Sequence, residues 1–175
     1  MANLNHVTGD VTEPQTLQTD EIVIIPHCCN NGTDKKGIGV MGAGVAWALR
    51  IKWPKVYEVY KRMENLYSDG LFGQLGENCY AKIDDHLVVV NMIAQNGVVS
   101  ESNSKPIKYV ALIECMKKIV DFIRTIQTQT TDHIVIHTPK FGSEFAGGTW
   151  SFIEELIMEI WIENNIDVVI YEFEE

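Results

Sequence analysis

Two glycine-rich segments, each directly after a strand-like run, constrain the fold of this chain most strongly. Residues 21–27 form a continuous apolar, β-branched run, typical of a strand that is buried on both faces. Five glycines follow within residues 30–44, and a second run at 133–137 leads into another glycine-rich segment at 139–148. A stretch with helical spacing follows each glycine segment. Two such strand–loop–helix units predict a parallel sheet with helices on both faces.

The rest of the chain continues this alternation. Further strands are expected at 4–7, 79–83, 87–94 and 167–173, the middle two as a hairpin around residues 84–86. Helices are expected at 45–52, from Pro54 to Tyr67 with a stop at Asp69–Gly70, from Pro106 to Ile126, and after Gly148. The predicted fold class is therefore α/β: a three-layer α/β/α sandwich with a mostly parallel mixed sheet.

Composition limits the classes of protein to consider. The 175 residues are 46% hydrophobic and 22% charged, which predicts one packed domain over residues 1–175. The net charge of −10 argues against a duplex nucleic acid as partner. The four cysteines have no paired spacing, and no leader-like or membrane-length apolar segment is present. We therefore expect a cytoplasmic protein with no membrane partner.

The two glycine-rich loops are expected to face one crevice, because ligands of parallel α/β sheets bind at the carboxyl ends of strands. Their free backbone N–H groups and the following helix N-termini suit anions, above all a diphosphate. The alternative is that the glycines serve only as turns and caps. Gly37-Ile-Gly39-Val-Met-Gly42 also matches the dinucleotide fingerprint of a Rossmann oxidoreductase. About ten residues separate it from the preceding strand, so this interpretation is less favoured.

Four segments of the sequence resemble the macrodomains, a family that binds ADP-ribose and its derivatives. These segments are Gly9-Asp-Val-Thr12, His27-Cys-Cys-Asn30 with Gly39–Ala46, Asn91-Met-Ile-Ala-Gln95, and Thr138–Trp150. They follow the family's order over nearly the whole chain. The second and fourth are most similar to the branch that contains ADP-ribose 1''-phosphate phosphatases and deacylating macrodomains.

The resemblance implies a binding role for particular residues. Asp10, between Gly9 and Val11, would accept a hydrogen bond from the adenine amine, while the Val11 N–H meets a ring nitrogen. Asn30 would hold the distal ribose, and two loops would surround the diphosphate. Their residues are Gly42, Ala43, Gly44 and Val45 in the first loop, and Phe141, Gly142, Ser143, Glu144, Phe145 and Ala146 in the second. Phe173 would stack on the adenine, with a core or edge aromatic as the alternative.

The sequence departs from the family at positions that matter for chemistry. Macrodomains of this branch that release ADP-ribose from acidic side chains use a lysine after the fourth strand and an aspartate in the second loop. Gln95 and Ala146 fall near those places here, and Thr149 replaces an acidic residue before the loop tryptophan. Lys105, on the adjoining loop, is a conceivable substitute for the lysine. A carboxylate-dependent mechanism is therefore in doubt.

The first functional hypothesis is a metal-independent phosphatase that converts ADP-ribose 1''-phosphate to ADP-ribose and phosphate. Asn30 and His27 are its candidate catalytic residues, because an unperturbed histidine exchanges protons near neutrality. A buried histidine with a structural role is the alternative for His27. The other functional hypotheses are a non-catalytic ADP-ribose reader, or a hydrolase of O-acyl-ADP-ribose or ADP-ribosylated protein. No cofactor or metal is expected.

Overall fold

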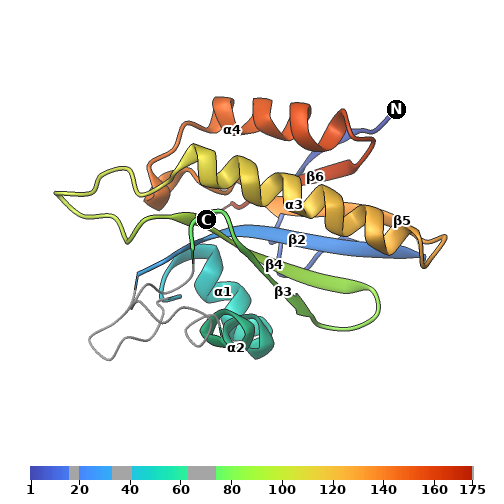
Figure 1. The fold of residues 1–175 in the computed structure, drawn as a ribbon, viewed down its shortest axis with the longest axis horizontal. Coiled ribbons are helices and arrows are strands. Elements are labelled where there is room, and N and C mark those ends of the chain that lie inside the picture. The colour runs from blue at the N-terminus through green and yellow to red at the C-terminus, as the bar shows by residue number, and fades with distance from the viewer. Residues whose placement is uncertain (16–19, 33–40, 63–73, 175) are drawn as a thin grey trace.

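A six-stranded mixed sheet forms the centre of the computed structural model, which describes residues 1–15, 20–32, 41–62 and 74–174 (Figure 1). The strands lie in the order β1-β6-β5-β2-β4-β3, and every neighbouring pair is parallel except β3 and β4. The strands are β1 (Leu4–Thr8), β2 (Glu21–Asn30), β3 (Asn78–Lys82), β4 (Leu87–Gln95), β5 (His133–Pro139) and β6 (Asp167–Glu172). The predicted sheet and its antiparallel hairpin are confirmed.

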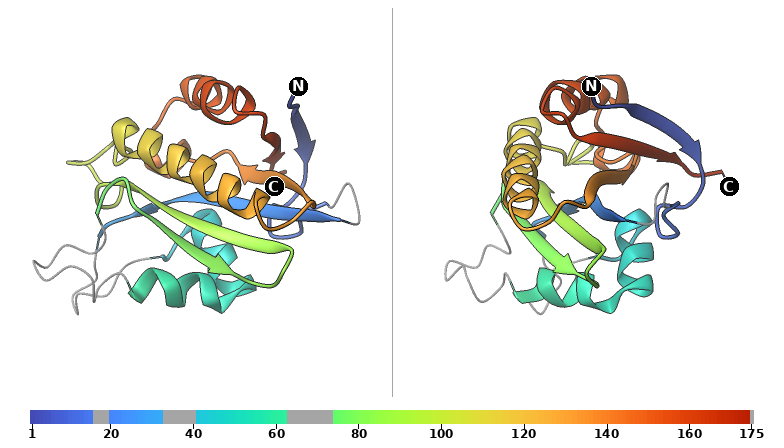
Figure 2. Two further views of the ribbon diagram at one scale, coloured as in Figure 1. Left: turned by 45° about the vertical axis from the view of Figure 1, so that its right-hand side comes forward. Right: turned by 90° about the vertical axis from the view of Figure 1, so that its right-hand side faces the viewer.

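Helices cover both faces of the sheet, as Figures 1 and 2 show. One face carries α1 (Gly44–Lys52) and α2 (Pro54–Arg62). The other carries α3 (Tyr109–Gln127), α4 (Trp150–Ile157) and the π-helix η3 (Met158–Ile162). Alternate side chains of the buried strands enter two separate cores, with Ile24 in the α3/α4 core and Ile25 in the α1/α2 core. This arrangement confirms the three-layer sandwich, and no helix of the described residues is long and apolar enough to cross a membrane.

Two element boundaries differ from the sequence expectation by three residues, each for a physical reason. Helix α3 begins at Tyr109 rather than Pro106, because the Ile107 and Lys108 N–H groups donate to the carbonyls of Ala146 and Ala94. These bonds hold the chain extended between β4 and the second glycine loop. Strand β2 continues beyond residue 27 to residue 30, alongside β4. The expected end of α2 near Tyr67 and its stop at Asp69–Gly70 lie outside the described residues.

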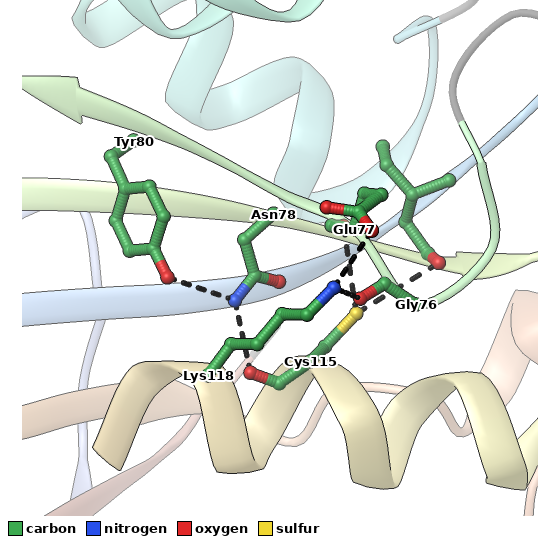
Figure 3. Close-up of polar contacts among 7 residues, drawn as sticks. Gly76, Glu77, Asn78, Tyr80, Cys115 and Lys118 are labelled. Atoms are coloured by element: carbon green, nitrogen blue, oxygen red, sulfur yellow. Dashed lines mark hydrogen bonds and ion pairs between the residues drawn. The ribbon is translucent and has the colours of Figure 1, made fainter. Parts of the chain in front are cut away.

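The outer strand β3 is fastened to α3 by polar contacts as well as by packing (Figure 3). The Asn78 side-chain amide donates to the Cys115 carbonyl at 2.9 Å. Lys118 on α3 donates to the Gly76 carbonyl at 2.8 Å and pairs with Glu77 at 2.8 Å. These bonds join the hairpin edge to the helix that covers it, and so fix β4, whose carboxyl end reaches the site described next.

Candidate functional site

A cleft of about 1020 Å³ opens at the carboxyl ends of β2, β5 and β6. Its size suits a ligand larger than a single nucleotide base. Of the residues predicted from sequence, all of those expected to bind ligand line this cleft. They are Gly9, Asp10, Val11, Asn30, Gly42, Ala43, Gly44, Val45, Phe141, Gly142, Ser143, Glu144, Phe145, Ala146 and Phe173.

The first glycine loop ends at an uncapped helix N-terminus beside the cleft. Ala43, the residue before α1, makes no capping hydrogen bond with its side chain, and the first amide to bond back is that of Trp47, to the Ala43 carbonyl at 3.2 Å. The N–H groups of Gly44, Val45 and Ala46 precede this bond and therefore have no acceptor within the helix. The helix dipole adds positive potential at the same place. This end of α1 is suited to a phosphate group.

The second glycine loop supplies another set of backbone donors. Phe141 anchors the loop, because its ring is buried against Trp150 and Trp161. The chain then makes a single 3-10 turn, η2 (Glu144–Ala146), whose first amides lack intrahelical acceptors. The Ser143 hydroxyl donates to the Lys140 carbonyl at 3.2 Å, so it supports the loop in this structure. The backbone amides, rather than the hydroxyl, are the donors offered to a ligand.

The two loops meet across the cleft. A Cβ atom placed on Gly44 would lie 3.6 Å from the ring of Phe145, so the residue 44 backbone and this ring are in near contact. Gly44 has φ +57°, a left-handed conformation that glycine adopts without steric cost. The two sets of amides therefore face the same narrow space, where both can contact a single diphosphate.

The Asp10 end of the cleft presents a carboxylate in a fixed orientation. The N–H and the hydroxyl of Thr12 both donate to Asp10 Oδ1 at 2.8 Å, which leaves Oδ2 for a ligand. The Tyr171 hydroxyl accepts the Gln15 N–H at 2.8 Å and lies 2.8 Å from Nδ1 of buried His137. This chain of contacts ties the loop that carries Asp10 to the sheet. Phe173, 71% exposed, lines the cleft just after β6.

The other end of the cleft lies where β2 stops. The Asn30 side-chain Oδ1 accepts the Gly32 N–H at 2.8 Å, and the Asn30 backbone carbonyl accepts the Tyr60 hydroxyl at 2.7 Å. The first bond sets the direction of the Asn30 side-chain amide, and the second holds the Asn30 backbone in place. Gln95, at the end of β4, lines the cleft with two half-exposed valines, Val98 and Val99. The end that would receive a distal ribose is therefore built from amides and apolar surface.

The structure does not bring His27 to the cleft. Because β2 runs on to residue 30, His27 lies inside the sheet, where its ring is fully buried and Nε2 donates to Asn91 Oδ1 at 2.6 Å. Burial lowers the pKa of His27 to about 4, so the ring is neutral at physiological pH. The position of His27 therefore fits the structural alternative rather than a direct catalytic role.

The two cysteines that follow His27 line the cleft, and their thiols are protonated at neutral pH. Cys28 and Cys29 line the cleft, and burial raises the pKa of both thiols well above the ordinary value. A thiol in this state is a poor nucleophile and a poor metal ligand. Within the described part of the chain, no group of three His, Cys, Asp or Glu side chains is placed to hold a metal ion.

The sequence prediction assigned no ligand contact to several other residues of the cleft wall, although some of them stand in the macrodomain-like segments and Gln95 was placed near a catalytic position: Cys28, Cys29, Met41, Ala46, Ala48, Gln95, Val98, Val99, Pro139, Lys140, Tyr171 and Glu172. Strand alternation was a usable signal for Tyr171, which is two residues before Phe173. Lys140 and Glu172 form an ion pair at 2.8 Å, and this pairing lowers the pKa of Glu172. The pair leaves little net charge at that part of the rim.

Two curated proteins match nearly the whole chain. The mouse chromodomain-helicase-DNA-binding protein 1-like is 30% identical over 183 residues, which cover 98% of this chain but only 18% of that protein. An ADP-ribose 1''-phosphate phosphatase from Scheffersomyces stipitis is 20% identical over 189 residues, covering 95% of this chain and 99% of the enzyme. No protein-family model matches the chain.

Solved structures match the fold over the same extent. A Bacteroides thetaiotaomicron protein of unknown function is 29% identical with a TM-score of 0.78, over 97% of this chain and 98% of the other. A Streptomyces coelicolor macrodomain protein is 26% identical with a TM-score of 0.73, over 97% and 99%. Thermosipho africanus DarTG, solved with ADP-ribose, is 17% identical with a TM-score of 0.68, over 99% of this chain and 42% of that one. With the layered sheet and its cleft, these likenesses show that the chain is a macrodomain.

Proposed function

We propose that the cleft binds ADP-ribose. The observation that carries this proposal is that two separate loops line one cleft with backbone amides that have no acceptor within their own helices, between the Asp10 carboxylate at one end and the Asn30 amide at the other. The adenine lies at Asp10, the diphosphate between the loops, and the distal ribose at Asn30. Backbone amides and a helix dipole act at contact distance, so they bind phosphate even in a chain of net charge −10.

Substitution of Asp10 tests the adenine end of this proposal. Asp10→Asn keeps an oxygen for the Thr12 N–H but replaces the second carboxylate oxygen with a donor, which opposes the adenine amine. Loss of a hydrogen bond to a charged group costs about 1.5–3 kcal/mol, so ADP-ribose should bind about 10- to 100-fold more weakly by calorimetry. Asp10→Ala should bind as weakly. Wild-type affinity in a folded Asp10→Asn protein would contradict the assigned role.

We further propose that the cleft hydrolyses ADP-ribose 1''-phosphate without a metal ion. The phosphatase from Scheffersomyces stipitis, similar over nearly its whole length, supports this substrate. Water attacks phosphorus, the bond to the 1'' oxygen breaks, and the departing hydroxyl takes a proton from the phosphate monoanion or from water. The loop amides stabilise the phosphoryl oxygens, and Asn30 orients the water.

Two positions of the cleft oppose release of ADP-ribose from proteins through a lysine adduct. Gln95 lines the cleft at the end of β4, and Ala146 lies buried in the second loop, so neither supplies an amine or a carboxylate. Lys105 lies over the Tyr109 ring, with Nζ 4.5 Å from the ring centroid, and does not line the cleft. A non-catalytic ADP-ribose reader, or a hydrolase of O-acyl-ADP-ribose, is the remaining alternative.

Phosphate release from ADP-ribose 1''-phosphate, measured with a chelator present, tests the hydrolysis. We expect release by the wild-type protein and a loss of about 100-fold or more in kcat for Asn30→Ala, as when one stabilising group of an active site is removed. ADP-ribose calorimetry on the same variant shows whether the cleft remains formed. If the wild-type protein binds ADP-ribose but releases no phosphate, the hydrolysis is excluded and the reader remains.

A further inference from the structure

Helices α1 and α2 concentrate positive charge on an acidic protein. Residues 44–62 contain five of the fourteen Lys and Arg but one of the twenty-four Asp and Glu, Glu58. Residues 150–175 contain eight Asp and Glu and no Lys or Arg. Four of these eight, Glu154, Glu155, Glu159 and Glu163, lie on or directly after α4 and η3, on the face of the sheet opposite α1 and α2 (Figures 1 and 2). A polyanion is therefore attracted more strongly to α1 and α2 than to α4 and η3.

Aromatic rings are interleaved with these cations. The Arg50 guanidinium carbon lies 3.6 Å from the centroid of the Tyr57 ring and 5.5 Å from that of Trp47. Lys61 Nζ lies 4.9 Å from the Tyr57 ring. Trp47 itself is 47% exposed. We name the α1–α2 surface by its members, Trp47, Arg50, Lys55, Tyr57, Lys61 and Arg62.

Helix stability does not account for the whole surface. Basic residues in the last turns of both helices complement the helix dipole. Lys55, however, lies in the first turn of α2, where a positive charge opposes the dipole. Trp47 leaves half of a large apolar ring in solvent next to Arg50. An exposed indole and a cation that disfavours its own helix point to a ligand outside the chain.

We propose that the α1–α2 surface binds single-stranded nucleic acid, separately from ADP-ribose in the cleft. Phosphates contact the lysines and arginines, and an unpaired base stacks on Trp47, the combination that single-strand binders use. A duplex has no unpaired base for the indole. Only the first residues of α1 line the cleft. The bound nucleic acid therefore lies beside the ADP-ribose site and does not occupy it.

Anisotropy of a labelled oligothymidylate of about 12 nucleotides, at low salt, tests the proposal with a matched pair of variants. Lys55→Glu and Lys117→Glu change the net charge of the protein by the same amount, and both positions are exposed on a helix. Lys117 lies on α3, outside the α1–α2 surface, so Lys117→Glu is the control. Lys55→Glu is expected to weaken binding roughly fivefold and to reduce the magnitude of the slope of log K against log salt by about 0.7. Lys117→Glu is expected to leave both unchanged. Glutamate at position 55 favours the start of α2, so unfolding does not explain a loss.

Trp47→Ala separates stacking from charge. Removal of a stacking ring is expected to weaken binding roughly tenfold while the salt slope stays as in the wild type. Saturating ADP-ribose should leave the affinity for the oligonucleotide unchanged, because the two ligands have separate sites. Calorimetry with ADP-ribose alone tests the cleft, so failure of oligonucleotide binding can be told apart from failure of ADP-ribose binding.

Results of three kinds would overturn the assignment. The first is no binding of the oligonucleotide by folded protein at about 50 mM salt, the low end of the range where phosphate contacts are strong. The second is equal weakening by Lys55→Glu and Lys117→Glu, or displacement by ADP-ribose. The third is wild-type self-association that Lys55→Glu abolishes, which would show that the acidic face of a second copy occupies this surface.

Discussion

Lowering the pH from 7 to 4 is expected to destabilise this protein by several kcal/mol, because two buried histidines resist protonation in the folded state. Burial lowers the pKa of both His27 and His137 to about 4. The ordinary value near 6.5 applies to the unfolded chain. The unfolded state therefore binds more protons as the pH falls. Stability is full above about pH 6.5 and is lost progressively toward pH 4, by about 3 kcal/mol for each histidine.

The surroundings of the two rings explain why protonation is costly. His27 is fully buried and has Asn91 as its hydrogen-bond partner. His137 is also fully buried; its Nδ1 lies by the Tyr171 hydroxyl, and its Nε2 has no hydrogen-bond partner among the residues that the structure describes. Glu21 partly offsets the desolvation of His137, because its negative charge raises the pKa of that ring. Within the described part of the chain, neither ring has a partner that fully compensates a positive charge.

Urea unfolding at pH 7.0, 5.5 and 4.5 measures the effect. We expect the free energy of unfolding of the wild-type protein to fall across this series, and that of His137→Gln to fall less, because one titrating group is removed. His6→Gln serves as the control, since His6 lies at the surface between Glu154 and Glu172. The same pH dependence in wild type and His137→Gln would contradict the assignment.

Gly147→Ala is expected to destabilise the protein strongly, because the added methyl group meets both a left-handed backbone and a collision with other backbone atoms. Gly147 has φ +72°, and a Cβ atom there would collide with the backbone carbonyl of Ser104. Ser104 cannot move away easily, because Ile107, three residues later, is bonded to the Ala146 carbonyl. The left-handed conformation alone costs about 1–2 kcal/mol for a non-glycine residue. The collision adds to this, for a total of roughly 3 kcal/mol or more.

Gly97→Ala is the matched control for this substitution. Gly97 has φ +71°, but the nearest atom to its added Cβ is Asn103 Nδ2 at 3.5 Å, an ordinary contact. Thermal or urea unfolding should therefore show a loss of about 1 kcal/mol for Gly97→Ala, from backbone strain alone. Gly147→Ala should also lose ADP-ribose affinity, since the second loop must shift. Equal destabilisation by the two variants would show that the collision is relieved without cost.

The sequence predicted the cleft well because its walls are local features. A glycine loop between a buried strand and an amphipathic helix is set by neighbouring residues, so both glycine loops of the cleft were found from pattern alone. The burial of His27, by contrast, depends on contacts with residues that are distant in the sequence. The letters His-Cys-Cys-Asn do not show where the strand ends, and pairing with β4 together with the bond from His27 to Asn91 carries the strand on to Asn30.

Contacts between distant segments account for the other differences. The Lys140–Glu172 pair and the approach of Phe145 to Gly44 join residues far apart in the chain, and no spacing rule predicts them. Val98 and Val99 stand in a polar stretch that predicted only a loop, yet they line the distal end of the cleft. The delayed start of α3 likewise depends on the carbonyls of Ala94 and Ala146, which belong to other elements.

Calorimetric titration of the wild-type protein with ADP-ribose and, separately, with NAD tests the central claim most directly. In the proposed binding mode the distal ribose lies at Asn30. NAD carries its nicotinamide at the 1'' position of that ribose, where the cleft would have to accommodate an additional ring. We predict saturable binding of one ADP-ribose per chain and much weaker binding of NAD. No heat with ADP-ribose, or tighter binding of NAD, would contradict the account.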